Sequence, residues 1–219
     1  VKEVGDASSP TKITQSVFDT GVLADCRKGI VLSEEVTDAV GSRFERVENT
    51  VQHRVLEKAT DGRPVCYAFN EATDTHVFEQ TEKPVHIRTE YQYDDFGNTL
   101  QENMEGVADQ DEDEIQTEKV YAYNPAIWLM DLVLRSTIRD GQGNRAAEEL
   151  SVYDERGNLL AQHRWLDRED RYIVSVRNEY DAFGNVASVT DALGRVTTNT
   201  YDATGTYLTR ITNALGHTR

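Results

Sequence analysis

The stretch YDAFGNVASVTDALGRVTTNTYDATGTYLTRITNALG, residues 180–216, carries four copies of an Asp/Asn-Ala-x-Gly turn. They begin at Asp181, Asp191, Asp202 and Asn213, so the spacings are 10, 11 and 11 residues. An Asp or Asn that opens a type I turn bonds to the following backbone N–H groups, and Gly at the fourth position accepts a positive φ. Such a turn closes a β-hairpin with a bulge. A fixed period of one turn and one short strand predicts a repeating β architecture.

The same signature occurs upstream at wider spacing, and a tyrosine directly precedes most of the turn aspartates. Stacked hairpins would bring these tyrosines into a cross-strand ladder, where aromatic neighbours add roughly 0.2–1 kcal/mol per pair. We predict that the turn formers and tyrosines are structural rather than catalytic. They are Tyr93, Asp94, Gly97, Asp140, Gly143, Tyr153, Asp154, Gly157, Tyr180, Asp181, Gly184, Asp191, Gly194, Tyr201, Asp202, Gly205 and Gly216.

The pattern Tyr-Asp-x-x-Gly-Asn, followed by a short strand and then Thr-Asp-x-x-Gly-Arg at residues 190–195, resembles the YD repeat of Rhs proteins. Relatives include the teneurin ectodomains and the B and C components of bacterial insecticidal toxin complexes. The stretch Tyr121–Gly143, with Tyr123-Asn124-Pro125, is similar to the less regular repeats of the B components. The resemblance covers residues 86–219 as a YD-repeat sheet region, whereas residues 1–85 match loosely and form an irregular β-rich region.

This resemblance implies an all-β fold of repeated antiparallel hairpins in a curved or spiral sheet, a fragment of a larger β-shell. In such families a hollow shell encloses a toxic polypeptide until delivery. The implied partners are the remainder of the parent shell, its enclosed toxin polypeptide and companion toxin-complex subunits. The implied location is secreted or on the bacterial cell surface. No enzymatic activity and no cofactor are expected.

A second interpretation is a binding module that displays aromatic side chains to a glycan or a receptor protein. Aromatic faces stack on sugars and anchor protein interfaces. Trp165 lies late in an expected strand that ends at an exposed loop, residues 167–170, whereas Trp128 resembles a buried plug in an irregular repeat. Glycan binding would separate this interpretation from a purely structural role.

Composition limits the possible partners. The chain has 219 residues, a net charge of −16, a pI near 4.7 and 38% hydrophobic residues. The acidic balance argues against binding to nucleic acid or to anionic membrane surfaces. The sequence contains no run of 18 or more apolar residues, so we expect no membrane-spanning segment in it.

Neither face of the expected strand Arg195–Tyr201 is strongly apolar, so we expect a sheet that is wetted by solvent and has a thin core. Val1 in place of Met, and repeats that run to Arg219, suggest a piece of a longer chain.

Several constellations imitate active chemistry. The acidic run at residues 109–114 opens like a calcium loop, but Glu114 stands where an EF-hand needs Gly, so a solvated acidic loop is expected. Residues 141–146 imitate a Gly-rich phosphate loop but fit better as a hairpin turn. The five histidines show no metal-ligand spacing, and no nucleophile motif occurs.

Further elements follow from local patterns. Alternation predicts a long strand over residues 44–56, bent at Asn49-Thr50, and a turn at residues 61–64 joins it to a strand over 65–69. Residues 85–93 form another strand. Residues 33–36 offer a weak helix start, and Pro125 suits a short helical turn within residues 124–131.

Cys26 and Cys66 lie 40 residues apart. A disulfide and two free thiols are both compatible with the sequence, and we favour free thiols because buried cysteine is common.

A sheet fragment exposes two outer strands, so we expect it to dimerise through one of them or to cover it with the N-terminal region.

Overall fold

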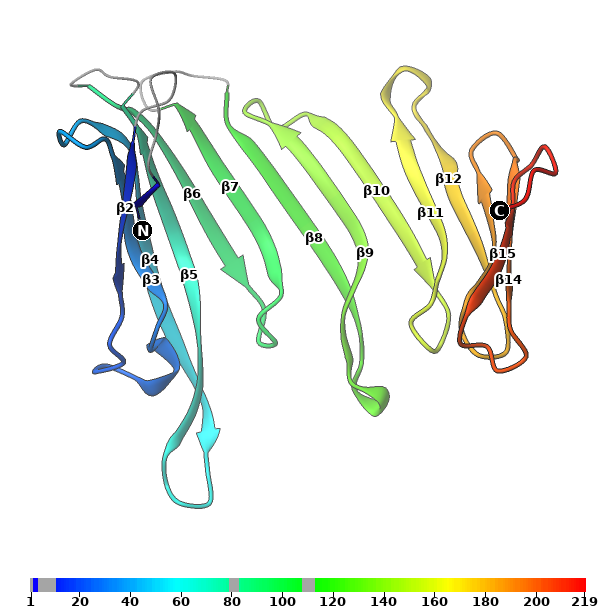
Figure 1. Cartoon of the computed structure of the whole chain (residues 1–219), viewed down its shortest axis with the longest axis horizontal. Helices are drawn as coiled ribbons and strands as arrows, with labels where there is room; N and C mark the ends of the chain where they lie inside the picture. The colour runs from blue at the N-terminus through cyan, green and yellow to red at the C-terminus, as the bar shows by residue number, and fades with distance from the viewer. Residues whose placement is uncertain (1, 4–10, 79–82, 108–112) are drawn as a thin grey trace. The chain divides into compact units, whose positions relative to one another are not determined.

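The computed structural model describes residues 2–3, 11–78, 83–107 and 113–219. Over these residues the chain forms fifteen strands and three short 3-10 turns (Figure 1), and within each unit described below neighbouring strands pair antiparallel. The chain divides into two compact units. The first comprises Val1–Gln116 and Asp140–Gln142, and the second comprises Thr117–Arg139 and Gly143–Arg219. The predicted all-β class with repeated hairpins is confirmed.

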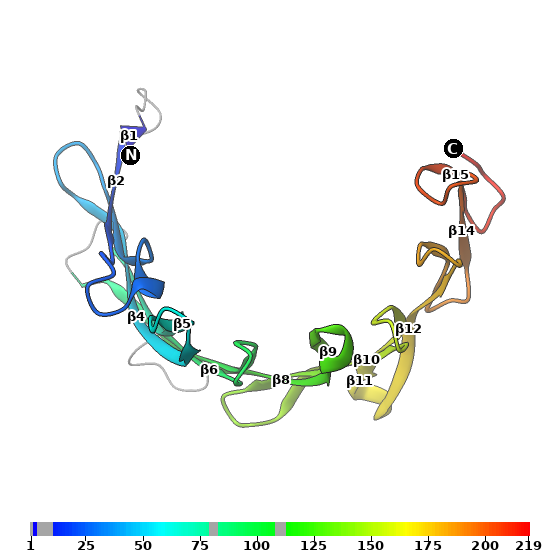
Figure 2. The ribbon, with the colours of Figure 1, turned by 90° about the horizontal axis from the view of Figure 1, so that it is seen from below.

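In the first unit the strands lie in chain order (Figure 2). Their bounds are β1 Lys2–Glu3, β2 Lys12–Phe18, β3 Val31–Thr37, β4 Arg43–Lys58, β5 Pro64–Val77, β6 Val85–Tyr93 and β7 Thr99–Val107. The 3-10 turn η1, Asp25–Arg27, lies in the β2–β3 connection. The long β4–β5 hairpin (cyan) extends beyond the turn that joins β6 to β7 (Figure 1).

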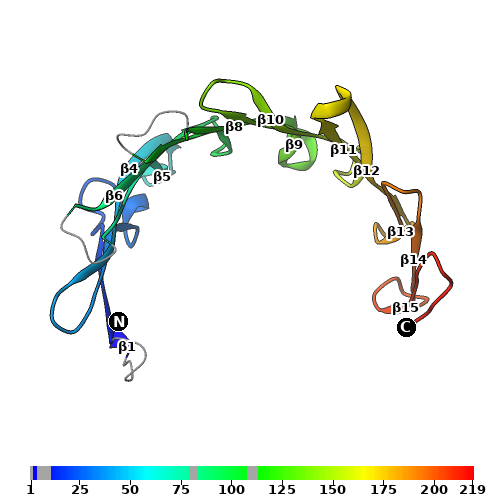
Figure 3. The same ribbon diagram turned by 90° about the horizontal axis from the view of Figure 1, so that it is seen from above.

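The second unit continues the same pattern, with each strand beside its chain neighbour (Figure 3). Its strands are β8 Ile115–Asn124, β9 Leu129–Asp140, β10 Arg145–Tyr153, β11 Leu159–Leu166, β12 Arg171–Tyr180, β13 Val186–Asp191, β14 Val196–Tyr201 and β15 Leu208–Thr212. The turns η2, Pro125–Ile127, and η3, Asp167–Glu169, close two of the hairpins. Since direction reverses at every strand, successive turns lie alternately at the two ends of the strands.

Most local predictions agree with the structure. β6 spans the predicted residues, the strand predicted at 44–56 is β4, and its pairing with β5 shifts between Thr50 and Val51, next to the predicted bend. β5 is longer than predicted. The helix start at residues 33–36 is wrong, because these residues lie in β3 and pair with β2 and β4. Strand pairing on both sides outweighs a weak helical preference.

The core is thin, as predicted. Among the described residues, the buried apolar side chains are those of Val51 and Ala72, both in the first unit. The buried residues described in the second unit are polar: Thr137, Glu148 and Ser188. Backbone pairing between strands therefore carries more of the fold than a packed apolar interior.

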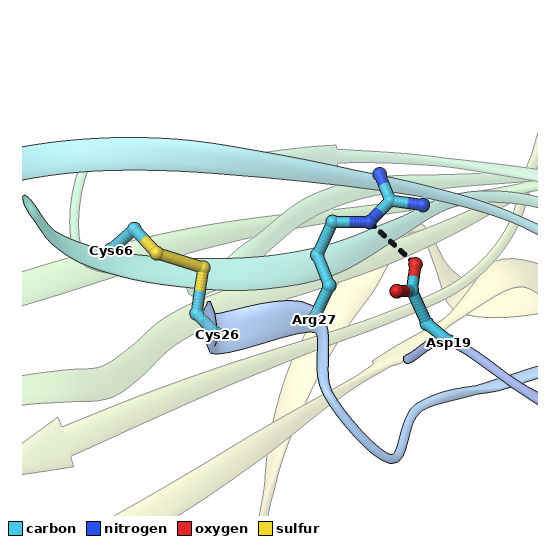
Figure 4. The surroundings of a disulfide bond; sticks show 4 residues. All are labelled: Asp19, Cys26, Arg27 and Cys66. Atoms are coloured by element: carbon cyan, nitrogen blue, oxygen red, sulfur yellow. Dashed lines mark hydrogen bonds and ion pairs between the residues drawn. A yellow bond between two sulfur atoms is a disulfide. The ribbon is translucent and has the colours of Figure 1, made fainter. Parts of the chain in front are cut away.

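Cys26 and Cys66 form a disulfide with their Cα atoms 5.8 Å apart (Figure 4). The preference for free thiols is therefore wrong. The β2–β3 loop folds back so that η1 packs against β4 and β5, which brings two residues 40 positions apart within bonding distance.

Candidate functional site

The repeated turns share one hydrogen-bond pattern. At Asp154 the backbone N–H donates to the Asn158 carbonyl at 3.0 Å, and the Gly157 N–H returns a bond to the Asp154 carbonyl at 3.1 Å. Asp154 Oδ1 accepts the N–H groups of Arg156 and Asn158, and Oδ2 accepts the Asn158 amide at 2.8 Å. One aspartate thus closes the turn with four acceptor bonds, which suits a type I turn followed by a Gly bulge.

The other predicted turn residues lie in the same geometry. Asp94 and Asp181 repeat the bonds of Asp154, including the amide of the following Asn. At Asp191 the Arg195 guanidinium replaces that amide at 2.6 Å, and at Asp202 the turn is one residue longer. Asp140 Oδ1 accepts the Gln142 N–H at 3.1 Å. The turn glycines all have φ between +69° and +89°: Gly97, Gly143, Gly157, Gly184, Gly194, Gly205 and Gly216.

The hydrogen bonds at these turns favour the ionised aspartate. The pKa of Asp154 lies below its usual value because the Asn158 side chain and backbone donate to the carboxylate. The pKa of Asp191 is lowered by the backbone N–H and then the side chain of Arg195. At Asp181 burial raises the pKa, but the bonds from Asn185 outweigh it and the net shift is downward. The turns are therefore built around charged carboxylates.

Tyr-Asp turns and Thr-Asp turns lie at opposite ends of the strands. In the second unit Tyr153, Tyr180 and Tyr201 end β10, β12 and β14, whereas the turns after β13 and β15 begin at Thr190-Asp191 and Thr212-Asn213. We call these two ends the Tyr-Asp rim and the Thr-Asp rim. The tyrosines occupy every second strand, so the predicted ladder of neighbouring tyrosines is wrong.

Each repeat tyrosine instead bonds to the preceding strand. The Tyr93, Tyr153 and Tyr180 hydroxyls donate to the carbonyls of Asn70, Val133 and Leu159 at 2.9, 3.2 and 2.9 Å. The Tyr201 hydroxyl reaches the Val186 carbonyl at 3.5 Å. These bonds tie each Tyr-Asp turn to the strand before it.

An asparagine two residues before the tyrosine shares this task, and the sequence interpretation missed it. Asn178 donates its amide to the Leu159 carbonyl at 2.9 Å, the same oxygen that Tyr180 reaches. Asn199 likewise donates to the Val186 carbonyl at 2.9 Å. The signal available in the sequence was the pair of Asn-x-Tyr-Asp segments at residues 178–181 and 199–202.

Neighbouring turns on the Tyr-Asp rim also pack on each other. The Phe183 ring lies over Gly205, where an added Cβ would collide with it, and the Asn185 amide donates to the Gly205 carbonyl at 2.8 Å. A Cβ at Gly157 would lie 2.6 Å from Leu129 Cδ1. On the Thr-Asp rim, Gly194 and Gly216 have no atom within 4 Å of such a Cβ. A side chain at these glycines is thus disfavoured by the positive φ on both rims, and at some Tyr-Asp turns also by a clash with a neighbouring side chain.

A polar cluster lies on one face of the second unit. Glu148, 7% exposed, accepts hydrogen bonds from Thr137 at 2.7 Å, from Arg145 at 3.1 Å and from the Tyr172 hydroxyl. The Arg145 guanidinium carbon lies 3.5 Å from the Trp165 ring centroid, and Tyr172 meets the same ring at 5.2 Å. The carboxylate is matched by three donors, so the cluster rigidifies β9 to β12.

Trp128 contradicts its prediction. It adopts a left-handed conformation with φ +57° at the end of η2, and 87% of its surface is exposed. It is therefore not a buried plug. Trp165, the other tryptophan, lies near the end of β11 and is half-buried under Arg145.

Neither a metal-binding cluster nor a membrane-spanning helix occurs in the part of the chain that is described. Over those residues no group of three or more His, Cys, Asp and Glu side chains is placed to hold a metal ion. The same residues contain no helix long and apolar enough to cross a membrane. Most of the acidic run, residues 109–112, lies outside the described residues.

Comparison with known proteins identifies the class. The model of the RHS repeat matches residues 180–218, where the Tyr-Asp and Thr-Asp turns alternate most regularly. Among curated proteins, none matches the chain. The predicted resemblance to Rhs/YD-repeat proteins is confirmed, with the repeat itself matched over residues 180–218.

Solved structures extend the likeness to almost the whole chain. The crystal structure of TcdB2-TccC3-Cdc42 matches with a TM-score of 0.66 at 10% identity, over 95% of this chain and 18% of that one. The Photorhabdus luminescens Tc holotoxin pore matches with a TM-score of 0.60 at 11% identity, over 94% and 18%. The chain thus spans about a fifth of the length of these toxin-complex chains and shares their fold over that part.

Proposed function

We propose that the chain is a non-catalytic wall segment of an Rhs/YD-repeat shell that encloses a toxin polypeptide. One observation supports this most strongly: nearly the whole chain has the hairpin fold of toxin-complex chains, yet it occupies about a fifth of their length. The remaining wall and the enclosed polypeptide would be its partners, and companion toxin-complex subunits would complete the assembly. A secreted or surface location follows from the same proposal.

The chemistry of the sheet suits a wall. The chain is polar overall, with 38% hydrophobic and 28% charged residues, although apolar side chains such as Leu23, Phe96 and Leu193 are exposed on it. A polar wall contacts a partly folded polypeptide without holding it through a large apolar surface. The groups that recur are turn aspartates, glycines and tyrosines, and these hold strands in register.

Protease protection tests the proposal. In the longer chain that contains this segment, limited proteolysis should leave one internal polypeptide uncut under native conditions. The same polypeptide should be cut rapidly once denaturant opens the shell. Equal cutting under both conditions would show that nothing is enclosed.

A binding role is a second candidate, because Trp128 is highly exposed at a turn. Tryptophan at such a position suits stacking on a sugar or insertion into a receptor pocket. A glycan array probed with the wild-type chain and with Trp128→Ala tests this role. Binding that the substitution abolishes supports it, and the absence of binding to any glycan excludes the carbohydrate form of the role.

A further inference from the structure

The β2–β3 connection is longer than the repeated Asp-x-x-Gly turns of the described residues. Phe18-Asp19-Thr20-Gly21 begins like a repeat turn, and Asp19 Oδ1 accepts the Gly21 N–H at 2.8 Å. The strand then resumes only at residue 31, and the Asp19 N–H donates to the Ile30 carbonyl at 2.8 Å. A loop carrying η1 is therefore inserted into an otherwise ordinary turn.

The loop covers a stretch of β4 that β3 does not reach. Pairing of β3 with β4 runs from Thr37↔Arg43 to Ser33↔Glu48, whereas β4 continues to Lys58. Beyond this pairing, Arg27 donates from Nη1 to the Val51 carbonyl at 2.7 Å. A strand edge without a strand neighbour is commonly covered by a loop, and η1 serves that purpose here.

Three contacts hold the loop. Cys26 is bonded to Cys66 of β5, and Arg27 Nε pairs with Asp19 at 2.7 Å (Figure 4). Arg27 also donates from Nη1 to the Val51 carbonyl. The Asp19 and Arg27 side chains are 8% and 12% exposed, and both cysteines are half-buried. The disulfide thus retains some contact with solvent.

We propose that Cys26–Cys66 is a redox-sensitive latch that fixes this loop over the edge of β4. A dithiol reductant opens it by thiol–disulfide exchange. The reductant thiolate attacks one sulfur and forms a mixed disulfide, and the other cysteine leaves as a thiolate. The second reductant thiol then releases the first cysteine. The two cysteines are reduced and take up two protons, and the reductant is oxidised to a disulfide.

Opening the latch leaves the sheet intact. β4 and β5 pair continuously from Glu45↔Val77 to Lys58↔Pro64, with two register shifts, and none of this pairing depends on the sulfur bond. The loop would retain only the Arg27 contacts and its own backbone bonds. Reduction therefore loosens the loop over the edge of β4, where Arg27 alone still holds it at Val51, without unfolding the hairpin.

Amide exchange with mass spectrometry tests the latch. Wild-type protein is measured with and without dithiothreitol under native conditions, together with Cys26→Ser/Cys66→Ser, and thiols are counted by alkylation. We expect two thiols to appear on reduction. Exchange at residues 19–30 should then rise about tenfold or more, a loss of about 1.4 kcal/mol of local protection, while β12 to β14 stay unchanged. The double variant should match the reduced protein.

A matched control separates the contribution of the disulfide from that of Arg27. Arg27→Gln should change exchange of the loop little while the disulfide is intact, and strongly once it is reduced. Two free thiols before reductant is added would refute the proposal. So would a disulfide that resists dithiothreitol until denaturant is present, or a reduction that raises exchange across the whole first unit.

Discussion

The contact between Phe183 and Gly205 gives a quantitative test of packing between neighbouring turns. Gly205 has φ +69°, and a Cβ there would collide with the Phe183 ring. Gly194 has φ +76° and open space around its Cβ position. Replacing either glycine by alanine incurs the left-handed backbone cost of about 1–2 kcal/mol. Only the Gly205 variant must also displace an aromatic ring.

The additional cost follows from the area that Phe183 buries. Its side chain is 67% exposed, so about a third of a side chain of roughly 200 Å² is covered. At about 25 cal/mol per Å² this is roughly 1.6 kcal/mol. We therefore expect Gly205→Ala to lower the free energy of unfolding by about 2.5–3.5 kcal/mol, and Gly194→Ala by about 1–2 kcal/mol.

A double-mutant cycle, measured by urea denaturation, tests this reasoning. It compares the wild type with Gly205→Ala, Phe183→Ala and the Phe183→Ala/Gly205→Ala double variant, and Gly194→Ala is the control. In the Phe183→Ala background Gly205→Ala should cost about as much as Gly194→Ala does in the wild type, because the ring no longer occupies the space. An equal loss for both glycine variants in the wild-type background would refute packing between the turns. A Gly205 penalty that persists after the ring is removed would do the same.

Three further predictions concern the rims and the outer strands. The pKa values of Asp154 and Asp191 are lowered in the folded state, relative to an unfolded value near 3.8. The stability that the two ionised carboxylates contribute is therefore complete above this value and falls as the pH drops below it. The urea midpoint measured as a function of pH should show this loss, and the loss should be smaller in Asp154→Asn. Tyr180→Phe should lower the free energy of unfolding by about 0.5–1 kcal/mol, because Asn178 still donates to the Leu159 carbonyl. The double variant Asn178→Ala/Tyr180→Phe should lower it by about 1–3 kcal/mol in the same denaturation assay, because the carbonyl then has neither donor. A double-variant loss equal to the sum of the two single losses would contradict a shared acceptor. The isolated chain should dimerise through an outer strand or cover it with its N-terminal residues, and light scattering showing a monomer with rapid amide exchange at both terminal strands would contradict this.

Local chemistry explains why the turns and most strands could be predicted. An Asp-x-x-Gly turn is determined by residues within five positions, and Asp154 makes its bonds to its own turn. The ring and hydroxyl contacts of the tyrosines depend on strand order. Tyr180 reaches the Leu159 carbonyl, 21 residues earlier, and no pattern in the repeat specifies that acceptor.

The errors arose where distant residues decide the outcome. Pairing of Cys26 with Cys66 requires a β4–β5 hairpin longer than its neighbours and a loop that folds onto it. Trp128 is predicted to be a buried plug in an irregular repeat, but Pro125 starts a 3-10 turn that ends with Trp128 in a left-handed conformation at the surface. The weak helical preference of residues 33–36 is overridden by two neighbouring strands.

The separation of the two turn types restricts how such a chain can change in length. Asp181 and Asp202 are 21 residues and two strands apart, so both lie on the Tyr-Asp rim. Gain or loss of one strand would reverse the direction of all strands after it and exchange the rims, leaving tyrosines without their acceptor carbonyls. Evolutionary growth of the repeat should therefore proceed by duplication of whole strand pairs, in steps of about 21 residues.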